Sequence, residues 1–213
     1  MAGLHETFSA DTQSIIRIEL PYEITSVNVD SQVVHIKAAN PDIFINLATP
    51  KFAAQAIRKA GELGWRPVQF LSNVSSSAGN VLVPAGIENS KGVITAGYIK
   101  DASDPQWKND EGVKEFRAFM AKYYPEGDPW NGTTIFAYGA AKSLVQILKQ
   151  CGDDLTRGNI MKQMSSLDMQ INVYLPGVKI KTSPADYAAI SQLQLLKFNG
   201  ERLEQFGSVI DGK

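Results

Sequence analysis

Two groups of polar residues in this chain have the types and spacing to contact a small ligand. Thr49 follows Ala48 and directly precedes a proline, and the stretch SNVSSS places Asn73, Val74, Ser75 and Ser76 close together. Their amide and hydroxyl groups donate and accept hydrogen bonds but carry no fixed charge. Two interpretations are possible for each group. Thr49 either caps a helix or meets a ligand, and the serine-rich stretch is either a binding loop or a solvated connection.

No motif for catalysis is found in the sequence. It lacks GxGxxG, a P-loop, GxSxG and HExxH. Two acidic pairs, Asp153-Asp154 and Asp101 with Asp104, fall in turn-rich segments, which is typical of solvated loops. We therefore expect a binding protein rather than an enzyme.

The residues that bind transition metals are scarce. The chain has one cysteine, Cys151, and two histidines, His5 and His35. A single cysteine excludes an intrachain disulfide and a cysteine-rich zinc site. Cys151 lies near the end of an expected helix, so a half-buried thiol is the simplest interpretation. No metal and no cofactor are predicted.

The composition is that of an ordinary globular protein. The 213 residues are 44% hydrophobic and 20% charged, which allows one large domain or two small ones. The net charge of −1 gives no reason to expect a nucleic-acid partner. The first residues, MAGLHETFSADTQ, lack the basic and apolar regions of a signal peptide, so we expect none in this chain.

The elements that would position the polar loops form an alternating pattern. A helix capped by Asp30 or Ser31 runs to Ala39, and the apolar strand Asp42–Leu47 follows. The next helix starts at Thr49-Pro50, with an apolar face and a stop at Gly64, before the strand Val68–Leu71. This alternation predicts an α/β fold with a parallel sheet, whose strands have helices on both faces. Ligands bind at the carboxyl ends of such strands, where both polar loops lie.

Apolar periodicity, helix caps and turn residues predict the remaining helices and strands. We expect strands at Ser14–Pro21 and Gly92–Tyr98, a short helix at Asn80–Ile87 interrupted by Pro84, helices at Glu111–Tyr124 and Thr133–Cys151, a helix capped by Thr156 through Met164, and a hairpin of Gln192–Phe198 and Arg202–Val209 with its turn at Asn199-Gly200.

From about Ser14 to the C-terminus the chain resembles the solute-binding proteins of ABC importers of the branched-chain amino-acid type. The resemblance rests on the order and spacing of VDSQVVHIKAANPDIFINLATPKFAAQAIRKAGELGW, GVITAGYIKDASDPQW, FAYGAAKSLVQILKQCG and LQLLKFNGERLEQFG. It implies the type I periplasmic-binding-protein fold, in which two α/β lobes joined by three crossing strands hold a solute in their cleft. Residues 14–99 would form the second lobe, 100–170 the helical part of an incomplete first lobe, and 171–213 a crossover with strands returning to the second lobe.

The resemblance also implies a function and a site. The chain would belong to an extracytoplasmic, periplasmic receptor that delivers a small solute to an ABC permease in the membrane. Ala48, Thr49 and Asn73 to Ser76 would line the cleft. Relatives that bind α-amino acids commonly place an acidic side chain in the second loop, where this chain has Asn73-Val74-Ser75. We therefore expect a neutral or carboxylate-bearing solute, such as an aromatic acid.

The chain departs from the family in its N-terminal part. It lacks the main sheet of the first lobe and looks like a C-terminal part opened by an unrelated leader, MAGLHETF. The helices from Glu111 to Met164 would then lose the strands that they cover, and we expect either self-association through exposed apolar side chains or partial disorder. Those side chains would be Ile135, Phe136, Leu144 and Leu148. Two alternatives remain: a truncated remnant without solute affinity, and an α/β enzyme of unknown reaction.

Overall fold

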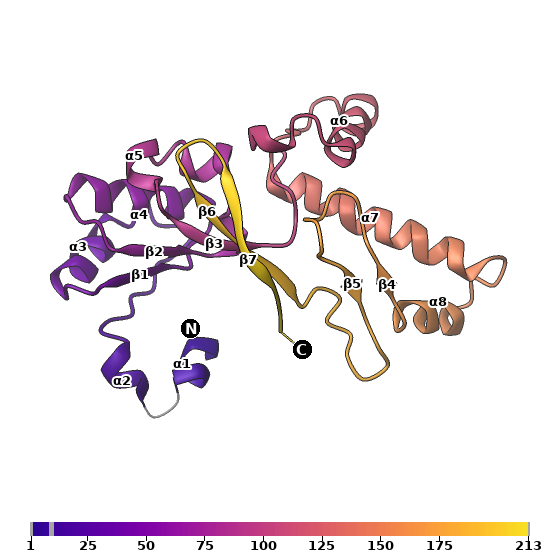
Figure 1. Cartoon of the computed structure of the whole chain (residues 1–213), viewed down its shortest axis with the longest axis horizontal. Helices are drawn as coiled ribbons and strands as arrows, with labels where there is room; N and C mark the ends of the chain where they lie inside the picture. The colour runs from indigo at the N-terminus through magenta and orange to yellow at the C-terminus, as the bar shows by residue number, and fades with distance from the viewer. Residues whose placement is uncertain (1, 9–10, 213) are drawn as a thin grey trace.

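A computed structural model describes residues 2–8 and 11–212. Figure 1 shows two parts side by side. The first part, called the sheet body, is a five-stranded sheet with helices packed on it. The second part, called the helical body, contains the helices α6 Glu111–Tyr123, α7 Gly132–Cys151 and α8 Arg157–Met164 and a two-stranded sheet. The elements of the sheet body are α3 Asp30–Ala38, β1 Ile43–Asn46, α4 Pro50–Glu62, β2 Val68–Leu71, α5 Ile87–Ser90, β3 Ile94–Gly97, β6 Gln192–Phe198 and β7 Leu203–Asp211.

The sheet of the sheet body is mixed, with the order β1-β2-β3-β6-β7. The first three strands are parallel, as the alternating sequence pattern predicts, and β6 and β7 are antiparallel. The hairpin prediction is confirmed, since Gly200 at its turn has φ +109°, a conformation open to glycine. The expected α/β class is confirmed by this arrangement.

One face of the sheet is packed against helices. α4 buries Phe52, Ala53, Ala56, Ile57 and Ala60, the face expected from their spacing, and Gly64 follows the helix with φ +65°. Phe44 of β1 and Leu71 of β2 belong to the same core. The predicted cap of α3 is wrong: Val29 is the N-cap residue and no side chain caps the helix. Asn28 Oδ1 instead accepts from the N–H of Asp30.

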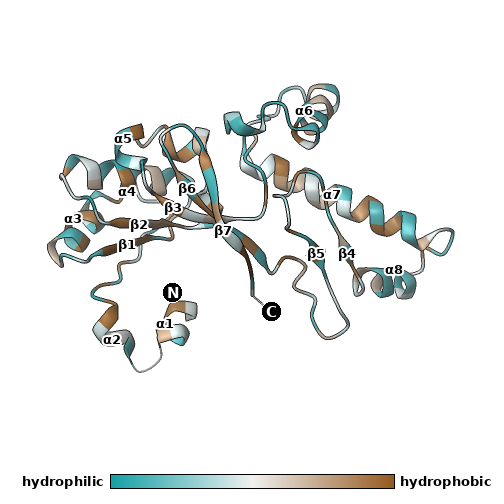
Figure 2. Ribbon diagram, viewed as in Figure 1, coloured by the Kyte–Doolittle hydropathy of each residue, from teal (hydrophilic) through white to brown (hydrophobic). Residues whose placement is uncertain are grey.

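The other face of the sheet is open, and the prediction of helices on both faces is wrong. Ile43, Ile45, Val68 and Phe70 are 50%, 39%, 51% and 38% exposed. They alternate with the buried Phe44 and Leu71, because successive side chains of a strand point to opposite faces. Figure 2 shows both strands as mostly hydrophobic, and Asn46 and Gln69 are their polar residues. The sequence carries the composition of a doubly covered sheet, but none of the described helices covers this face.

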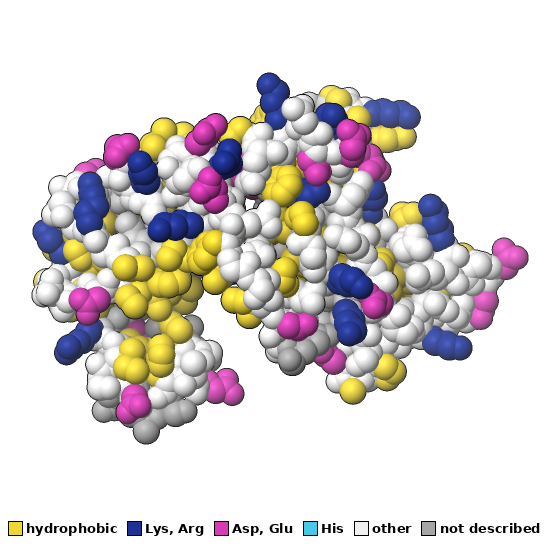
Figure 3. Space-filling view, viewed as in Figure 1, with side chains coloured by type: hydrophobic (Ala, Val, Ile, Leu, Met, Phe, Trp, Pro, Cys, Tyr) yellow, Lys and Arg dark blue, Asp and Glu magenta, His cyan; other side chains and the backbone are white. Residues whose placement is uncertain are grey.

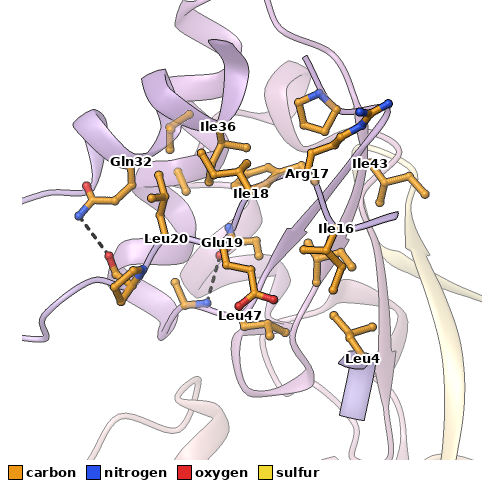
Figure 4. A pocket seen from close by; sticks show the side chains of 18 of the residues that line it. Leu4, Ile16, Arg17, Ile18, Glu19, Leu20, Gln32, Ile36, Ile43 and Leu47 are labelled. Atoms are coloured by element: carbon orange, nitrogen blue, oxygen red, sulfur yellow. Dashed lines mark hydrogen bonds between the residues drawn. The ribbon is translucent and has the colours of Figure 1, made fainter. Parts of the chain in front are cut away.

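The predicted strand at Ser14–Pro21 is also wrong. Residues 2–8 and 12–15 form the short helices α1 Ala2–Phe8 and α2 Thr12–Ile15, and residues 16–20 belong to no sheet. The sequence IRIEL keeps the alternation of a strand. A cavity of about 950 Å³ separates it from β1, so it has no strand to pair with (Figure 4).

The segment after β2 differs in detail from the short helix predicted at Asn80–Ile87. A 3-10 turn, η2 Asn73–Ser75, precedes a π-helical turn, η3 Ala78–Leu82, and α5 begins only at Ile87. Pro84 and Gly86, the latter with φ +99°, separate the two helical pieces. The expected interruption at Pro84 is therefore present, but η3 begins two residues before the predicted range and α5 begins at its last residue.

The helical body confirms three predicted helices. They are α6 Glu111–Tyr123, α7 Gly132–Cys151 and α8 Arg157–Met164, and Thr156 caps α8 by accepting from the N–H of Asn159. The two-stranded sheet of β4 Asp168–Met169 and β5 Ile180–Lys181 was not predicted. A separate core joins these elements through Val113, Phe116, Met120, Ile135 and Ile147, among others.

The predicted apolar surface of α7 is present except at one residue. Phe136, Leu144 and Leu148 are 43%, 48% and 37% exposed, but Ile135 is fully buried. Successive residues of a helix point about 100° apart, so Ile135 faces the core of the helical body while Phe136 faces outward. Within the part of the chain that the structure describes, no helix has both the length and the apolar character needed to cross a bilayer.

The two bodies are joined by hydrogen-bonded crossing segments. The N–H of Leu175 donates to the carbonyl of Tyr98, and the N–H of Lys100 donates to the carbonyl of Val173, both at 2.9 Å. The buried Lys100 ammonium lies 2.7 Å from a carboxylate oxygen of Asp110. Asp104 is buried, and the N–H of Leu203 donates to its carboxylate at 2.8 Å. These contacts set the position of the sheet body against the helical body.

Candidate ligand-binding site

The two polar loops lie together at the carboxyl ends of β1 and β2. The buried Ser75 hydroxyl donates a 2.6 Å hydrogen bond to the carbonyl of Ala48. The N–H of Ser72 donates to the carbonyl of Asn46 at 2.9 Å and extends the β1–β2 ladder to the start of the second loop. The parallel order of the strands thus brings together residues 27 positions apart in the sequence.

Thr49 has a role that its position before Pro50 does not reveal. α4 begins at Pro50 with Thr49 as its N-cap, but the threonine hydroxyl makes no capping hydrogen bond. Tyr22 donates from its hydroxyl to Thr49 Oγ1 at 3.2 Å and accepts from the N–H of Thr49 at 2.8 Å. The ring of Tyr22 packs against Phe52, with 4.9 Å between centroids. Tyr22 therefore holds the first loop in place.

The second loop satisfies part of its own hydrogen bonding. Ser76 Oγ donates to the carbonyl of Asn73 at 2.7 Å, and Ser72 Oγ accepts from the N–H of Val74 at 3.4 Å. Val74 is 68% exposed, and Asn73 is also exposed. The groups that remain open to a ligand are therefore the Asn73 amide and the apolar Val74 side chain. Ser75 and Ala48 are buried, and the hydrogen bond between them holds the two loops together.

The charged groups beside the two loops are Lys51, which follows the first loop, and Asp101, which contacts the end of the second. None of the six predicted residues is acidic. The N-terminus of α4 has no side-chain cap, so backbone N–H groups of its first turn point toward the loops' side of the sheet. The exposed Lys51 follows Pro50, with its ammonium 5.0 Å from the centroid of the Phe52 ring. Backbone N–H groups and an ammonium together favour an anionic group over a cationic one.

Sequence reasoning missed the residues that follow the third parallel strand. Tyr98 lies just after β3 and meets Tyr174 edge-on, with 5.9 Å between ring centroids; burial raises the pKa of its phenol. Asp101 Oδ2 accepts from the N–H of Ala78 at 2.6 Å, at the end of the serine-rich stretch. The rule that ligands bind at the carboxyl ends of parallel strands, applied to β3 as well, points to this segment.

One contact reaches from the loop region to the helical body. Asn80 donates from its side-chain amide to the carbonyl of Trp130 at 3.0 Å. Arg117 of α6 lies over the Trp130 ring, 4.4 Å from its centroid, and donates to the carbonyl of Ala102 at 2.7 Å. Across the described ranges, no group of three or more histidine, cysteine, aspartate or glutamate side chains is arranged to hold a metal ion.

Comparison with models of known families identifies the family of this chain. The model of the periplasmic binding protein family matches residues 14–202. The chain belongs to the periplasmic binding protein family. The family model begins at Ser14, as the resemblance predicted, and covers the helical body, the crossing segments and the sheet body except its last strand, β7, because the match ends at Arg202. A comparison with curated proteins gave no match.

Solved structures share the fold at low sequence identity. A branched-chain amino acid ABC transporter protein from Thermus thermophilus, solved with bound valine, has a TM-score of 0.71 at 12% identity, with 88% of this chain and 50% of that chain covered. A fatty acid ABC transporter substrate-binding protein from Thermomonospora curvata has a TM-score of 0.67 at 22% identity, with 91% and 49% covered. This chain spans about half the length of these structures, and identities of this size establish the fold alone.

Proposed function

We propose that this chain forms one wall of the solute cleft of an ABC-importer receptor that works in the periplasm. On this proposal residues 14–99 are most of the second lobe, 100–170 are the helical part of the first lobe, and 171–213 cross back to the second. The observation that carries the proposal is the joined pair of loops at the carboxyl ends of β1 and β2, in a chain of this family. A membrane permease would be the partner that receives the solute.

The proposed contacts follow from what each loop leaves open. Asn73 and Val74 would touch the solute directly, and the Thr49 and Ser76 hydroxyl oxygens, which already take part in hydrogen bonds, would accept from it. Ala48 and Ser75 set the distance between the loops. The solute would be held by hydrogen bonds and apolar contact, and closure of the two bodies on a hinge would complete the site. No covalent step and no cofactor are needed for this role.

The proposed solute is a small carboxylate-bearing or neutral organic molecule, such as an aromatic acid, rather than an α-amino acid. Support comes from the uncapped N-terminus of α4 and from Lys51, which favour a carboxylate, and from the lack of an acid among the six loop residues. A buried ammonium without a carboxylate partner would be costly. Tight calorimetric binding of leucine or valine would contradict this choice.

The decisive experiment is a thermal-shift and calorimetric screen of aromatic acids, fatty acids and α-amino acids. A ligand that binds the native state raises Tm, and a carboxylate class should do so before any amino acid. The variant Val74→Asp places a carboxylate in the second loop and should reverse the preference by about tenfold or more, toward amino acids. Val83→Asp adds the same charge at another exposed valine, and should leave the preference unchanged. No shift with any class would favour a remnant without solute affinity.

We also propose that the exposed side of α7 promotes self-association. Phe136, Leu144, Val145 and Leu148 are each more than one-third exposed on one helix. An apolar patch of this kind is a common site of association. Light scattering over a concentration series should show oligomers that Leu144→Glu weakens. A monomer at all concentrations would contradict this proposal.

A further inference from the structure

The cavity beside β1 has a lining that combines backbone edges with apolar side chains. Residues 14–22 form one side of it and residues 40–48, with β1, form another. α3 contributes Val33 and Ile36, and the N-terminal helices contribute Leu4, Phe8 and Ile15. Figure 4 shows Ile16, Ile18, Leu20, Ile43 and Leu47 among the side chains that line the cavity, and Figure 3 shows hydrophobic side chains gathered on this side of the sheet body, next to the N-terminal helices.

The backbone of β1 is unpaired along this cavity. β1 pairs with β2 alone, and the carbonyls of Asp42 and Asn46 accept from the second strand. Because backbone groups alternate in direction along a strand, those of Ile43 and Ile45 point to the open edge. Across the cavity, residues 17–20 make no backbone-to-backbone hydrogen bond with any other residue that the structure describes. Two extended stretches with free edges thus face each other.

The side chains have the pattern of an interior position in a sheet. β1 is apolar on both faces, with Phe44 on the helix side and Ile43 and Ile45 on the other. Strands in the middle of parallel sheets have apolar side chains on both faces, whereas natural edge strands are short, carry charges or are covered by other segments. The facing segment alternates apolar Ile16, Ile18 and Leu20 with Arg17 and Glu19. Glu19 pairs with His5 of α1, which ties the segment to the N-terminal helix.

The size of the cavity fits one strand. Strands lie about 4.8 Å apart and a sheet layer is about 10 Å thick, so a volume of about 950 Å³ corresponds to a length of about 20 Å. At about 3.3 Å per residue, that is about six residues. An apolar small molecule of this volume would fill the space but would leave the edges of Ile43 and Ile45 without hydrogen bonds, which is unfavourable next to apolar surface.

We propose that this cavity receives a β-strand of about six apolar residues, contributed by the part of a periplasmic-binding-protein fold that these 213 residues do not supply. The chain spans about half of its solved relatives, so such a fold has a second half that can supply the strand. A second copy of this chain is a poorer source. Its other free sheet edge is β7, which carries Glu204, Gln205 and Asp211 and is mostly exposed.

The test uses a soluble probe and variants that block the edge alone. The probe is a fluorescent peptide of alternating valine and isoleucine flanked by lysines, and its control has a proline at the centre. In the chain, Ile45→Pro removes an N–H that points to the cavity, so the β1–β2 ladder is retained. Ile45→Val is the matched control. Ile18→Asp places a charge on the facing segment, outside any helix or strand, and serves as a second block.

The proposal predicts saturable binding of the peptide and slower hydrogen exchange at the Ile43 amide. Loss of the edge hydrogen bonds should weaken binding about tenfold or more in Ile45→Pro and Ile18→Asp, and with the proline peptide, but not in Ile45→Val. Absence of binding, or equal binding by all variants, would overturn the proposal. So would a dimer that Ile45→Pro dissociates, since the occupant would then be a second copy, or a fatty acid that displaces the peptide and binds Ile45→Pro equally well.

Discussion

The hydrogen bond from Ser75 to Ala48 is the contact that holds the two loops together, and Ser75→Ala tests it. Ser75 is fully buried, its hydroxyl lies 2.6 Å from the carbonyl of Ala48, and no other donor to that carbonyl is found among the described residues. Removing the hydroxyl loses one buried hydrogen bond and leaves a nearly buried carbonyl without a partner. The expected cost is about 2 kcal/mol.

For a chain of this size that cost should lower Tm by about 4–8 °C. The assay is urea and thermal unfolding followed by tryptophan fluorescence, with Trp65 reporting from the core of the sheet body. Ser76→Ala is the matched control, because the Ser76 hydroxyl is half-buried and bonds within its own loop. That variant should change stability by less than about 0.5 kcal/mol. If both variants behave alike, the contact between the loops does not stabilise the site.

Two further predictions concern the helical body. A Cβ at Gly112 would lie 2.1 Å from the carbonyl oxygen of Asn172, so Gly112→Ala should destabilise the chain by about 1–3 kcal/mol in urea unfolding; Gly158→Ala, where nothing lies within 4 Å, should be neutral or stabilising. The pKa of Glu115 is lowered, chiefly by its hydrogen bond from Lys142, so this carboxylate stabilises the fold above its unfolded pKa and the effect is lost as pH falls through the folded pKa. Glu115→Gln should therefore show a smaller loss of Tm between about pH 6 and pH 3; an unchanged pH profile would contradict the assignment.

Local signals in the sequence predicted the elements that depend on few residues. The Thr49-Pro50 helix start, the Thr156 cap and the Asn199-Gly200 turn each act within a few positions, and each marks an element that the structure contains. The parallel arrangement of β1 and β2 followed from the alternation of apolar strands and amphipathic helices. For the same reason the two polar loops could be placed at one edge of the sheet.

Contacts between distant positions could not be predicted in this way. The bond between Tyr22 and Thr49 spans 27 residues, and nothing in the local sequence distinguishes a threonine held by a tyrosine from one that caps a helix. Residues 16–20 alternate apolar and charged side chains, as a half-buried strand does. A strand forms only with a partner strand, however, and the described residues provide none for this segment. Ile135 shows the same limit, because its burial depends on which side of α7 the rest of the helical body occupies.

Three contacts that hold the proposed wall of the cleft lie within residues 14–99. Tyr22 holds Thr49, Ser75 holds Ala48, and Ser76 holds Asn73, whereas contact with the helical body is made by other residues, such as Asn80 with Trp130. On the proposed function, discrimination between a carboxylate and an ammonium is set by this wall, and closure of the two bodies adds affinity. Asn80→Ala should therefore weaken all ligands by a similar factor and leave their order unchanged in calorimetry. A change in that order would show that selectivity depends on the contact between the bodies.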